Sequence, residues 1–365
     1  MRLLLRRLLA RGLAAALGLA AAIAGLDAHA GLPVFCERGK EVSAAEQDRV
    51  LRFAGAVKAE LDRSGASVAL VARSGLDLSR FKLLYSHAGI ALAANPGGRW
   101  AVRQLYYACD ESRPRLFDQG MAGFVLGADS PARGHVALLF LPEATAAPLQ
   151  RAALDDRLAL SLLAARYSAN AYAFGTRYQN CNQWVAELLA AAWGGVGDAG
   201  SGRVGRPRDR VATSPADVDA AADGDAAADG GVDSGADGGT DGAAAPASHA
   251  HARARTDART RAQSWLRAQG YDAGPVEVPS HWLMFAGQFV PLVHLDDHPL
   301  DDIYALALHT SVPAAIENFV HARAPGTRRV ELCHDESRIV VHRGWEPLGA
   351  ACAPLPGDEV IELTR

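Results

Sequence analysis

The chain has 365 residues, of which 49% are hydrophobic and 21% charged, and its formal net charge at pH 7 is −4. A chain of this length and hydrophobic content can bury a core of ordinary size. The slightly acidic balance, without a basic patch, argues against nucleic acid as a partner.

Residues 1–30 have the pattern of a secretory signal peptide. Several arginines between Arg2 and Arg11 precede an apolar run from Leu13 to Gly25, and Ala28-His29-Ala30 supplies a small-x-small cleavage site. The run is shorter than the ~20 residues that span a bilayer, so we expect cleavage and no transmembrane segment afterwards. The mature chain is therefore expected to work in a bacterial periplasm or outside the cell.

Helices and short strands are predicted to alternate over the first half of the mature chain. Ser43 and Glu46 form a capping-box pattern at the start of a helix over 44–63. Further along, strands are predicted at 67–72, 83–93, 100–107 and 136–141, and a helix at 147–168. The turn signal at 95–98 makes 83–107 a predicted β-hairpin.

Composition changes abruptly after residue 195. Residues 196–261 are rich in Ala, Gly and Asp, with almost no large apolar side chain, which predicts a disordered linker. Structure is expected to return with a helix at 262–270, a helix at 312–321 and paired strands at 328–332 and 338–343. We expect residues 262–365 to form an α+β subdomain that packs on the domain of residues 31–195.

Cys181 lies at the start of a predicted amphipathic helix over 181–193. The positive end of the helix dipole favours a thiolate at this position. Asn180 and Asn182 flank the cysteine with amides, which suits a helix cap or an oxyanion-stabilising turn. The alternative is that Cys181 is a small buried hydrophobe, which is common for a free cysteine.

His87 lies on the predicted strand 83–93, and a histidine beside the thiol would act as base and proton carrier. The hairpin turn at 95–98 puts Gln104 opposite or diagonal to His87, where its carbonyl can accept the imidazole N–H. A satisfied core histidine and a solvent-facing glutamine are the alternatives.

The cysteine count fits a free Cys181. Five cysteines are present (Cys36, Cys109, Cys181, Cys333 and Cys352), and an odd number in an oxidising compartment leaves one thiol over. Pairing Cys36 with Cys109 and Cys333 with Cys352 leaves Cys181 free, although other pairings, and five reduced cysteines, stay open.

The sequence also bears on a metal site and on a serine hydrolase site. The cluster from His294 to His298, followed by Asp301 and Asp302, has the residue types of a metal site but no standard zinc spacing. We therefore expect a solvated acidic loop there, with no metal and no cofactor. The Gly-x-Ser-x-Gly pattern of serine hydrolases is absent from the sequence.

The order of histidine strand, polar strand and cysteine helix resembles the circularly permuted NlpC-like branch of the papain-like fold. The segments 70–75, 86–90 and 179–184 carry this resemblance. It implies Cys181 as nucleophile, His87 as base and Gln104 as third residue. Together with Phe35-Cys36-Glu37 and the segment 341–347, these motifs also resemble an uncharacterised bacterial group, domain-of-unknown-function family 2145.

The sequence thus predicts an α+β fold in which the cysteine helix packs on a small antiparallel sheet. The predicted activity is thiol-mediated hydrolysis or acyl transfer at an amide or ester, in a cell-wall peptide or a lipid or lipoprotein acyl group. The alternative is a non-catalytic envelope protein that keeps the fold for binding or scaffolding.

Overall fold

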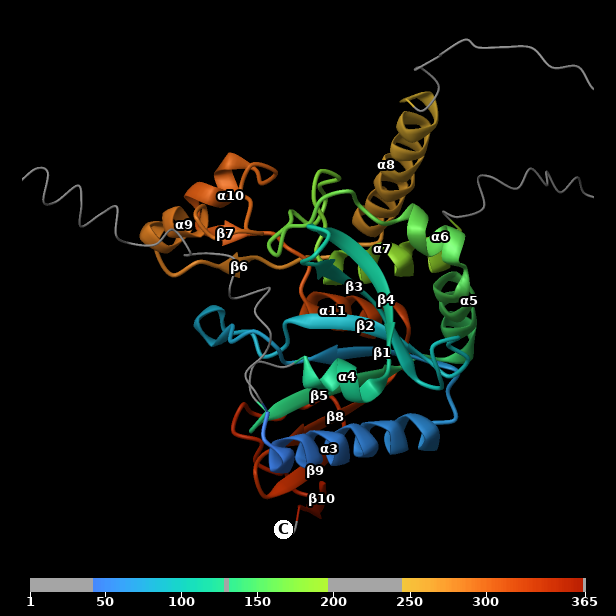
Figure 1. The fold of residues 1–365 in the computed structure, drawn as a ribbon, viewed down its shortest axis with the longest axis vertical. Coiled ribbons are helices and arrows are strands. Elements are labelled where there is room, and N and C mark those ends of the chain that lie inside the picture. The colour runs from blue at the N-terminus through green and yellow to red at the C-terminus, as the bar shows by residue number, and fades with distance from the viewer. Residues whose placement is uncertain (1–41, 128–130, 196–244, 364–365) are drawn as a thin grey trace, which may run out of the picture.

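One antiparallel sheet organises the chain. The computed structural model describes residues 42–127, 131–195 and 245–363, so the predicted signal peptide and Cys36 lie outside the described residues. The sheet has eight strands in the order β10-β9-β8-β5-β1-β2-β3-β4 (Figure 1). Their bounds are β1 Val68–Arg73, β2 His87–Leu92, β3 Ala101–Ala108, β4 Arg113–Gln119, β5 Gly134–Phe140, β8 Arg328–His334, β9 Arg338–Arg343 and β10 Glu359–Glu362. The α+β class is confirmed, whereas the expectation of a small sheet was wrong.

The sheet is large because the C-terminal block supplies three of its strands. The predicted pair β8–β9 is confirmed, and β8 also pairs with β5, from Gly134 opposite His334 to Phe140 opposite Arg328. Strands β5 and β8, which are far apart in the sequence, are therefore neighbours in one continuous sheet.

Helices cover both faces of the sheet. On one face, α3 (Ala44–Arg63) and α4 (Met121–Leu126) pack on strand residues such as Val71 and Val102. On the other, α5 (Glu143–Leu154), α7 (Cys181–Gly194) and α11 (Pro313–Arg323) share a core with strand residues such as Leu70 and Ile90, and α8 (Ala245–Ala268) packs on α7. Because side chains alternate along a strand, successive residues of β2 point into the cores on opposite faces of the sheet.

Local capping signals fix several helix boundaries. The predicted capping box is confirmed, with the Ser43 side chain accepting from the Glu46 N–H. The predicted single helix over 147–168 was wrong, since α5 ends at Leu154 and α6 (Asp156–Ser161) begins anew. Asp155 separates them because its carboxylate accepts the Leu158 N–H and starts a second helix. Strand β4 and helix α4 were not predicted.

The predicted linker over 196–261 extends too far, because a helix begins before residue 261. Residues 196–244 lie outside the described residues, but α8 begins at Ala245, and Arg259 within it is only 1% exposed. From 245 to 261 the chain has no glycine and is rich in alanine and arginine, which are strong helix formers. The change in composition that marks the start of α8 is therefore the end of the Asp/Gly run near residue 242.

A small lobe precedes α11. It consists of β6 (Val276–Glu277), α9 (His281–Gly287), α10 (Leu300–Tyr304) and β7 (Ala307–Leu308), where β6 and β7 form a separate two-stranded sheet. Its core contains Val278, Met284 and Leu308.

The disulfide Cys333–Cys352 ties β8 to the loop that precedes β10, across a sequence separation of 19 residues. Replacing both cysteines by alanine is expected to lower the free energy of unfolding by about 3 kcal/mol, because the bridge restricts the unfolded chain. Urea unfolding of the oxidised wild type and the double variant measures this difference. A difference below about 0.5 kcal/mol would show that the bridge contributes little to stability.

Candidate functional site

Cys181 occupies the first position of α7, as predicted. The Asn180 side chain caps this helix by accepting the Gln183 N–H at 2.7 Å. Cys181 is the only free cysteine among the residues that the structure describes, and its side chain is 6% exposed. The predicted bridge between Cys333 and Cys352 is confirmed, and Cys109 is also disulfide-bonded, while its predicted partner Cys36 lies outside the described residues.

The thiol of Cys181 lies among backbone N–H groups. Those of Asn182, Ala88 and Cys181 itself hydrogen-bond to the sulfur. Burial nevertheless raises the pKa of the thiol to about 11, although the charge of Arg73 and these N–H groups act in the opposite direction. Desolvation of the buried sulfur thus outweighs the stabilisation that the helix dipole gives a thiolate.

His87 is the first residue of β2 and is buried with Gln104 as its partner. The register of β2 and β3, with Ile90 opposite Arg103, places Gln104 diagonal to His87. The His87 Nε2 atom donates to the Gln104 Oε1 atom at 2.5 Å. Because a carbonyl oxygen only accepts, Nε2 carries the proton and Nδ1 keeps its lone pair.

The imidazole of His87 is held in its neutral form. Burial and then the charge of Arg73 lower the pKa of His87 to about 3, while the hydrogen bond with Gln104 acts in the opposite direction. Arg73 lies directly opposite His87 in the β1–β2 pair. At neutral pH the ring is therefore a free base that can accept a proton at Nδ1.

The thiol lies beside Ala88, the residue that follows His87, but the thiol and the imidazole face different cores. Cys181 and Ala88 belong to the core on the α7 face. The ring of His87 contacts Tyr106 and Phe124, with ring centroids 5.5 and 5.9 Å apart, and Phe124 belongs to the core on the α4 face. In the described part of the chain, no hydrogen bond joins the thiol to the ring.

Asn180 and Asn182 fasten the start of α7 to its surroundings. The Asn182 amide donates to the carbonyls of Ser86 and Ser311, both at 3.2 Å. The Asn180 amide donates to the Thr310 hydroxyl at 3.0 Å and to the Ser311 carbonyl at 3.1 Å. These side chains therefore position the cysteine against the residue before His87, and their N–H groups are occupied.

Two residues near the site were missed by the sequence analysis. Arg73 is buried, lies opposite His87 and affects the pKa of both His87 and Cys181. Tyr167 reaches the thiol from the loop before α7, where burial and the nearby Cys181 raise the pKa of its hydroxyl. The strand pairing could have indicated Arg73, whereas no sequence pattern indicated Tyr167.

The cluster from His294 to His298 makes ordinary structural contacts. His298 Nε2 hydrogen-bonds to the Asn170 carbonyl at 2.7 Å, and the Asp297 carboxylate accepts the Tyr172 N–H at 3.1 Å. Within the described ranges, no group of three such side chains could hold a metal ion. Nor does any described helix have the length and apolar character to cross a bilayer.

Alkylation of Cys181 should report its resting protonation state. Since the pKa of the thiol is about 11, the rate constant for iodoacetamide is expected to rise about tenfold per pH unit between pH 7 and 10. Mass spectrometry of the Cys181 peptide measures this rate, with a free cysteine peptide as reference. A rate that is constant over this range would show instead a preformed thiolate–imidazolium pair.

Comparison with known proteins identifies one family. A family model described as "Uncharacterized protein conserved in bacteria (DUF2145)" matches residues 60–209 and 243–320. Neither the curated proteins nor the solved structures give a match to this chain.

Proposed function

The chain belongs to this uncharacterised bacterial family, and from its site we propose that it is a thiol hydrolase or acyltransferase acting on an amide or ester. One observation carries the proposal: a free thiol at the start of α7 accepts the N–H of Ala88, the residue next to the His87–Gln104 pair. In this proposal Cys181 is the nucleophile, His87 the base and Gln104 the residue that orients the ring. The permuted NlpC-like relationship is part of the same proposal.

The reaction begins with transfer of the thiol proton to His87 Nδ1. The sulfur then attacks the carbonyl carbon and forms a C–S bond, and backbone N–H groups at the start of α7 stabilise the oxyanion. As the C–N or C–O bond breaks, the imidazolium returns its proton to the leaving amine or alcohol. Water, or an acceptor amine or alcohol, next attacks the thioester, and the thiol is restored.

Proton transfer requires the ring of His87 to turn toward the thiol. His87 begins β2, so its ring lies at a strand end, and rotation about χ1 leaves the ladder with β3 from Ile90 onward intact. The rotation breaks the hydrogen bond to Gln104, so Gln104 orients the ring in its resting state. Catalytic hydrogen bonds are often long or poorly aligned before substrate binds. We infer that substrate binding assembles the pair, and that the neutral thiol and neutral imidazole are its resting state.

An extracytoplasmic location belongs to the proposal. Disulfides at Cys109 and between Cys333 and Cys352 are compatible with an oxidising compartment, where stable bridges form. In the bacterial periplasm, the available amides and esters include cell-wall peptides and the acyl groups of lipids and lipoproteins.

The second candidate is a non-catalytic envelope protein that binds or scaffolds. The observation in its favour is that the buried thiol is protonated and makes no hydrogen bond to His87 in the described part of the chain. In this case Cys181 is a packed core residue and the surrounding network is structural.

Turnover of a small aryl ester distinguishes the two candidates. We expect the wild type to hydrolyse p-nitrophenyl acetate and Cys181→Ser to fall to the uncatalysed rate, because an unactivated hydroxyl is a poor substitute for the thiol. The Cys333→Ala/Cys352→Ala double variant is the matched control and is expected to retain activity. Equal rates for the wild type and Cys181→Ser would favour the non-catalytic candidate.

A further inference from the structure

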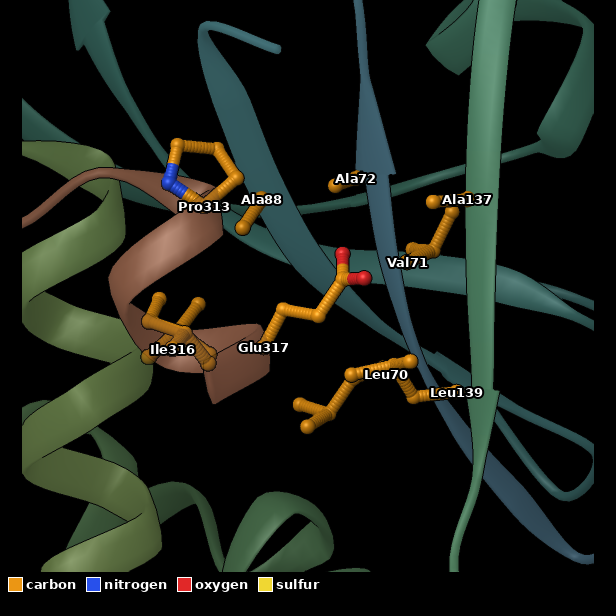
Figure 2. Close-up of a pocket in the computed structure, with 10 residues that line it drawn as sticks. Leu70, Val71, Ala72, Ala88, Ala137, Leu139, Pro313, Ile316 and Glu317 are labelled. Carbon is orange, nitrogen blue, oxygen red and sulfur yellow. The ribbon is translucent and has the colours of Figure 1, made fainter. Parts of the chain in front are cut away.

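A small pocket lies on the same face of the sheet as Cys181. It is enclosed by α7, α11 and strands β1, β2 and β5 (Figure 2). Its walls are mostly apolar and include Leu70, Ala72, Ala88, Leu139, Val185 and Ile316. Glu317 is the one charged residue among the lining residues, and Figure 2 shows its carboxylate pointing from α11 toward β1.

The guanidinium of Arg329 pairs with two carboxylates, those of Glu317 and Glu331. The Arg329 Nε atom donates to Glu317 Oε1 at 2.5 Å, and the Arg329 Nη1 atom donates to Glu331 Oε2 at 2.7 Å. Both ion pairs are largely buried, since the Arg329 side chain is 3% exposed. Two carboxylates and one guanidinium leave one negative charge without a counter-charge inside this group.

The uncompensated charge is best placed on Glu317. Both oxygens of Glu331 are hydrogen-bonded, Oε1 to the Tyr85 hydroxyl and Oε2 to Arg329 and the Leu348 N–H. In contrast, the second oxygen of Glu317 has no hydrogen-bond partner among the described residues. The Glu317 side chain is 18% exposed, so a solute can reach it.

The pocket lies close to the thiol of Cys181, because β2 and α7 each supply residues both to the pocket and to the surroundings of the sulfur. Ala88 contributes its side chain to the pocket and its N–H to the sulfur of Cys181. Val185, which lines the pocket, follows Cys181 by about one helical turn, or roughly 6 Å along α7. A molecule whose carbonyl lies at the sulfur can therefore extend a chain of a few bonds into the pocket.

We propose that this pocket binds a primary ammonium group carried on the acyl part of the substrate, with the free oxygen of Glu317 as its acceptor. The inference rests on the proposed function and selects among its substrates. It favours amino-bearing acyl groups, such as those of peptides, over the fatty acyl chains of lipids.

Size and charge both favour an ammonium. The pocket offers about 20 Å³ to the centre of a water-sized group, so a compact terminal group fits into it. A carboxylate oxygen in an apolar pocket is stabilised by a cation that hydrogen-bonds to it. A primary ammonium combines a compact shape with three donors.

Two isosteric anilides test the proposal. In 5-aminopentanoyl p-nitroanilide an ammonium occupies the place of the terminal methyl in hexanoyl p-nitroanilide. For the wild type, kcat/KM is expected to be roughly tenfold to a hundredfold higher for the amino substrate, as for a charge-assisted hydrogen bond. Glu317→Gln is expected to abolish this preference and to leave the hexanoyl rate within about twofold, because the new amide oxygen still accepts from Arg329.

Glu336→Gln is the matched control, since it removes the same charge from an exposed position. It is expected to leave both substrates unchanged. A preference for hexanoyl, or an unchanged preference in Glu317→Gln, would overturn the subsite.

Binding to Cys181→Ala separates this proposal from the proposed function. The probes are 5-aminopentanamide and hexanamide, followed by NMR titration. If neither anilide is turned over, the proposed function fails, and the binding result alone decides the subsite. Tighter binding of the amino probe that is lost in Cys181→Ala/Glu317→Gln supports it, whereas equal binding of both probes contradicts it.

Discussion

His87→Ala is expected to slow the acylation of Cys181 by about 10²–10⁴, the usual contribution of a positioned general base. The variant removes the atom that takes the thiol proton, while Cys181 and the N–H groups around it stay in place. Stopped-flow release of p-nitrophenol from an aryl ester measures the acylation rate. Added imidazole is expected to restore part of the rate, because a free base can enter the space that the ring leaves.

Two controls separate chemistry from folding in this experiment. The melting temperature shows whether His87→Ala still folds, since the ring is buried between Tyr106 and Phe124. Gln104→Leu retains the ring and removes its hydrogen-bond partner, along with the bond from the Gln104 amide to Gln119, so we expect a smaller loss of rate than for His87→Ala. A folded His87→Ala protein that acylates at the wild-type rate would show that His87 is not the base.

Glu187→Ala is expected to lower the free energy of unfolding by about 3–5 kcal/mol, because it leaves the guanidinium of Arg259 buried without its counter-charge. Glu187 on α7 is fully buried and accepts from Arg259 at 2.9 Å, Gln263 at 2.7 Å and Gln179 at 2.6 Å. Arg259 also donates to the carbonyls of Gly175, Thr176 and Tyr178, in the loop before the cysteine helix. The network thus holds α8 and that loop against α7.

Urea unfolding measures the effect of Glu187→Ala. Asp48→Ala is the matched control, because its ion pair with Arg52 is exposed and is expected to contribute less than about 1 kcal/mol. The double variant Glu187→Met/Arg259→Met is expected to recover much of the lost stability, since it removes both charges together. Similar small losses for Glu187→Ala and Asp48→Ala would mean that the buried pair does not fasten α8.

The parts of the fold that local patterns determine could be predicted from the sequence. The capping box at Ser43, the start of α7 at Cys181 and the hairpin of β2 and β3 depend on residues close in sequence. The hydrogen bond between His87 and Gln104 was predictable for the same reason, because a short turn fixes the register.

The parts that depend on distant residues could not be predicted in this way. The pairing of β5 with β8 joins strands almost 200 positions apart in the sequence, and no local pattern specifies it. The raised pKa of the Cys181 thiol could not be predicted, because burial, which the sequence does not show, outweighs the helix dipole there. The Glu317 pocket likewise exists only where α11 meets β1, β2 and β5.

Trapping the acyl group on the protein tests the central claim most directly. The wild type and His87→Ala are mixed with an aryl ester, quenched in acid within the first turnover and mapped by peptide mass spectrometry. We predict a thioester on Cys181 in the wild type and little or none in His87→Ala at the same time. Ester turnover with Cys181 unmodified, or equal acylation of Cys181 in both proteins, would contradict the assignment of Cys181 as nucleophile and His87 as its base.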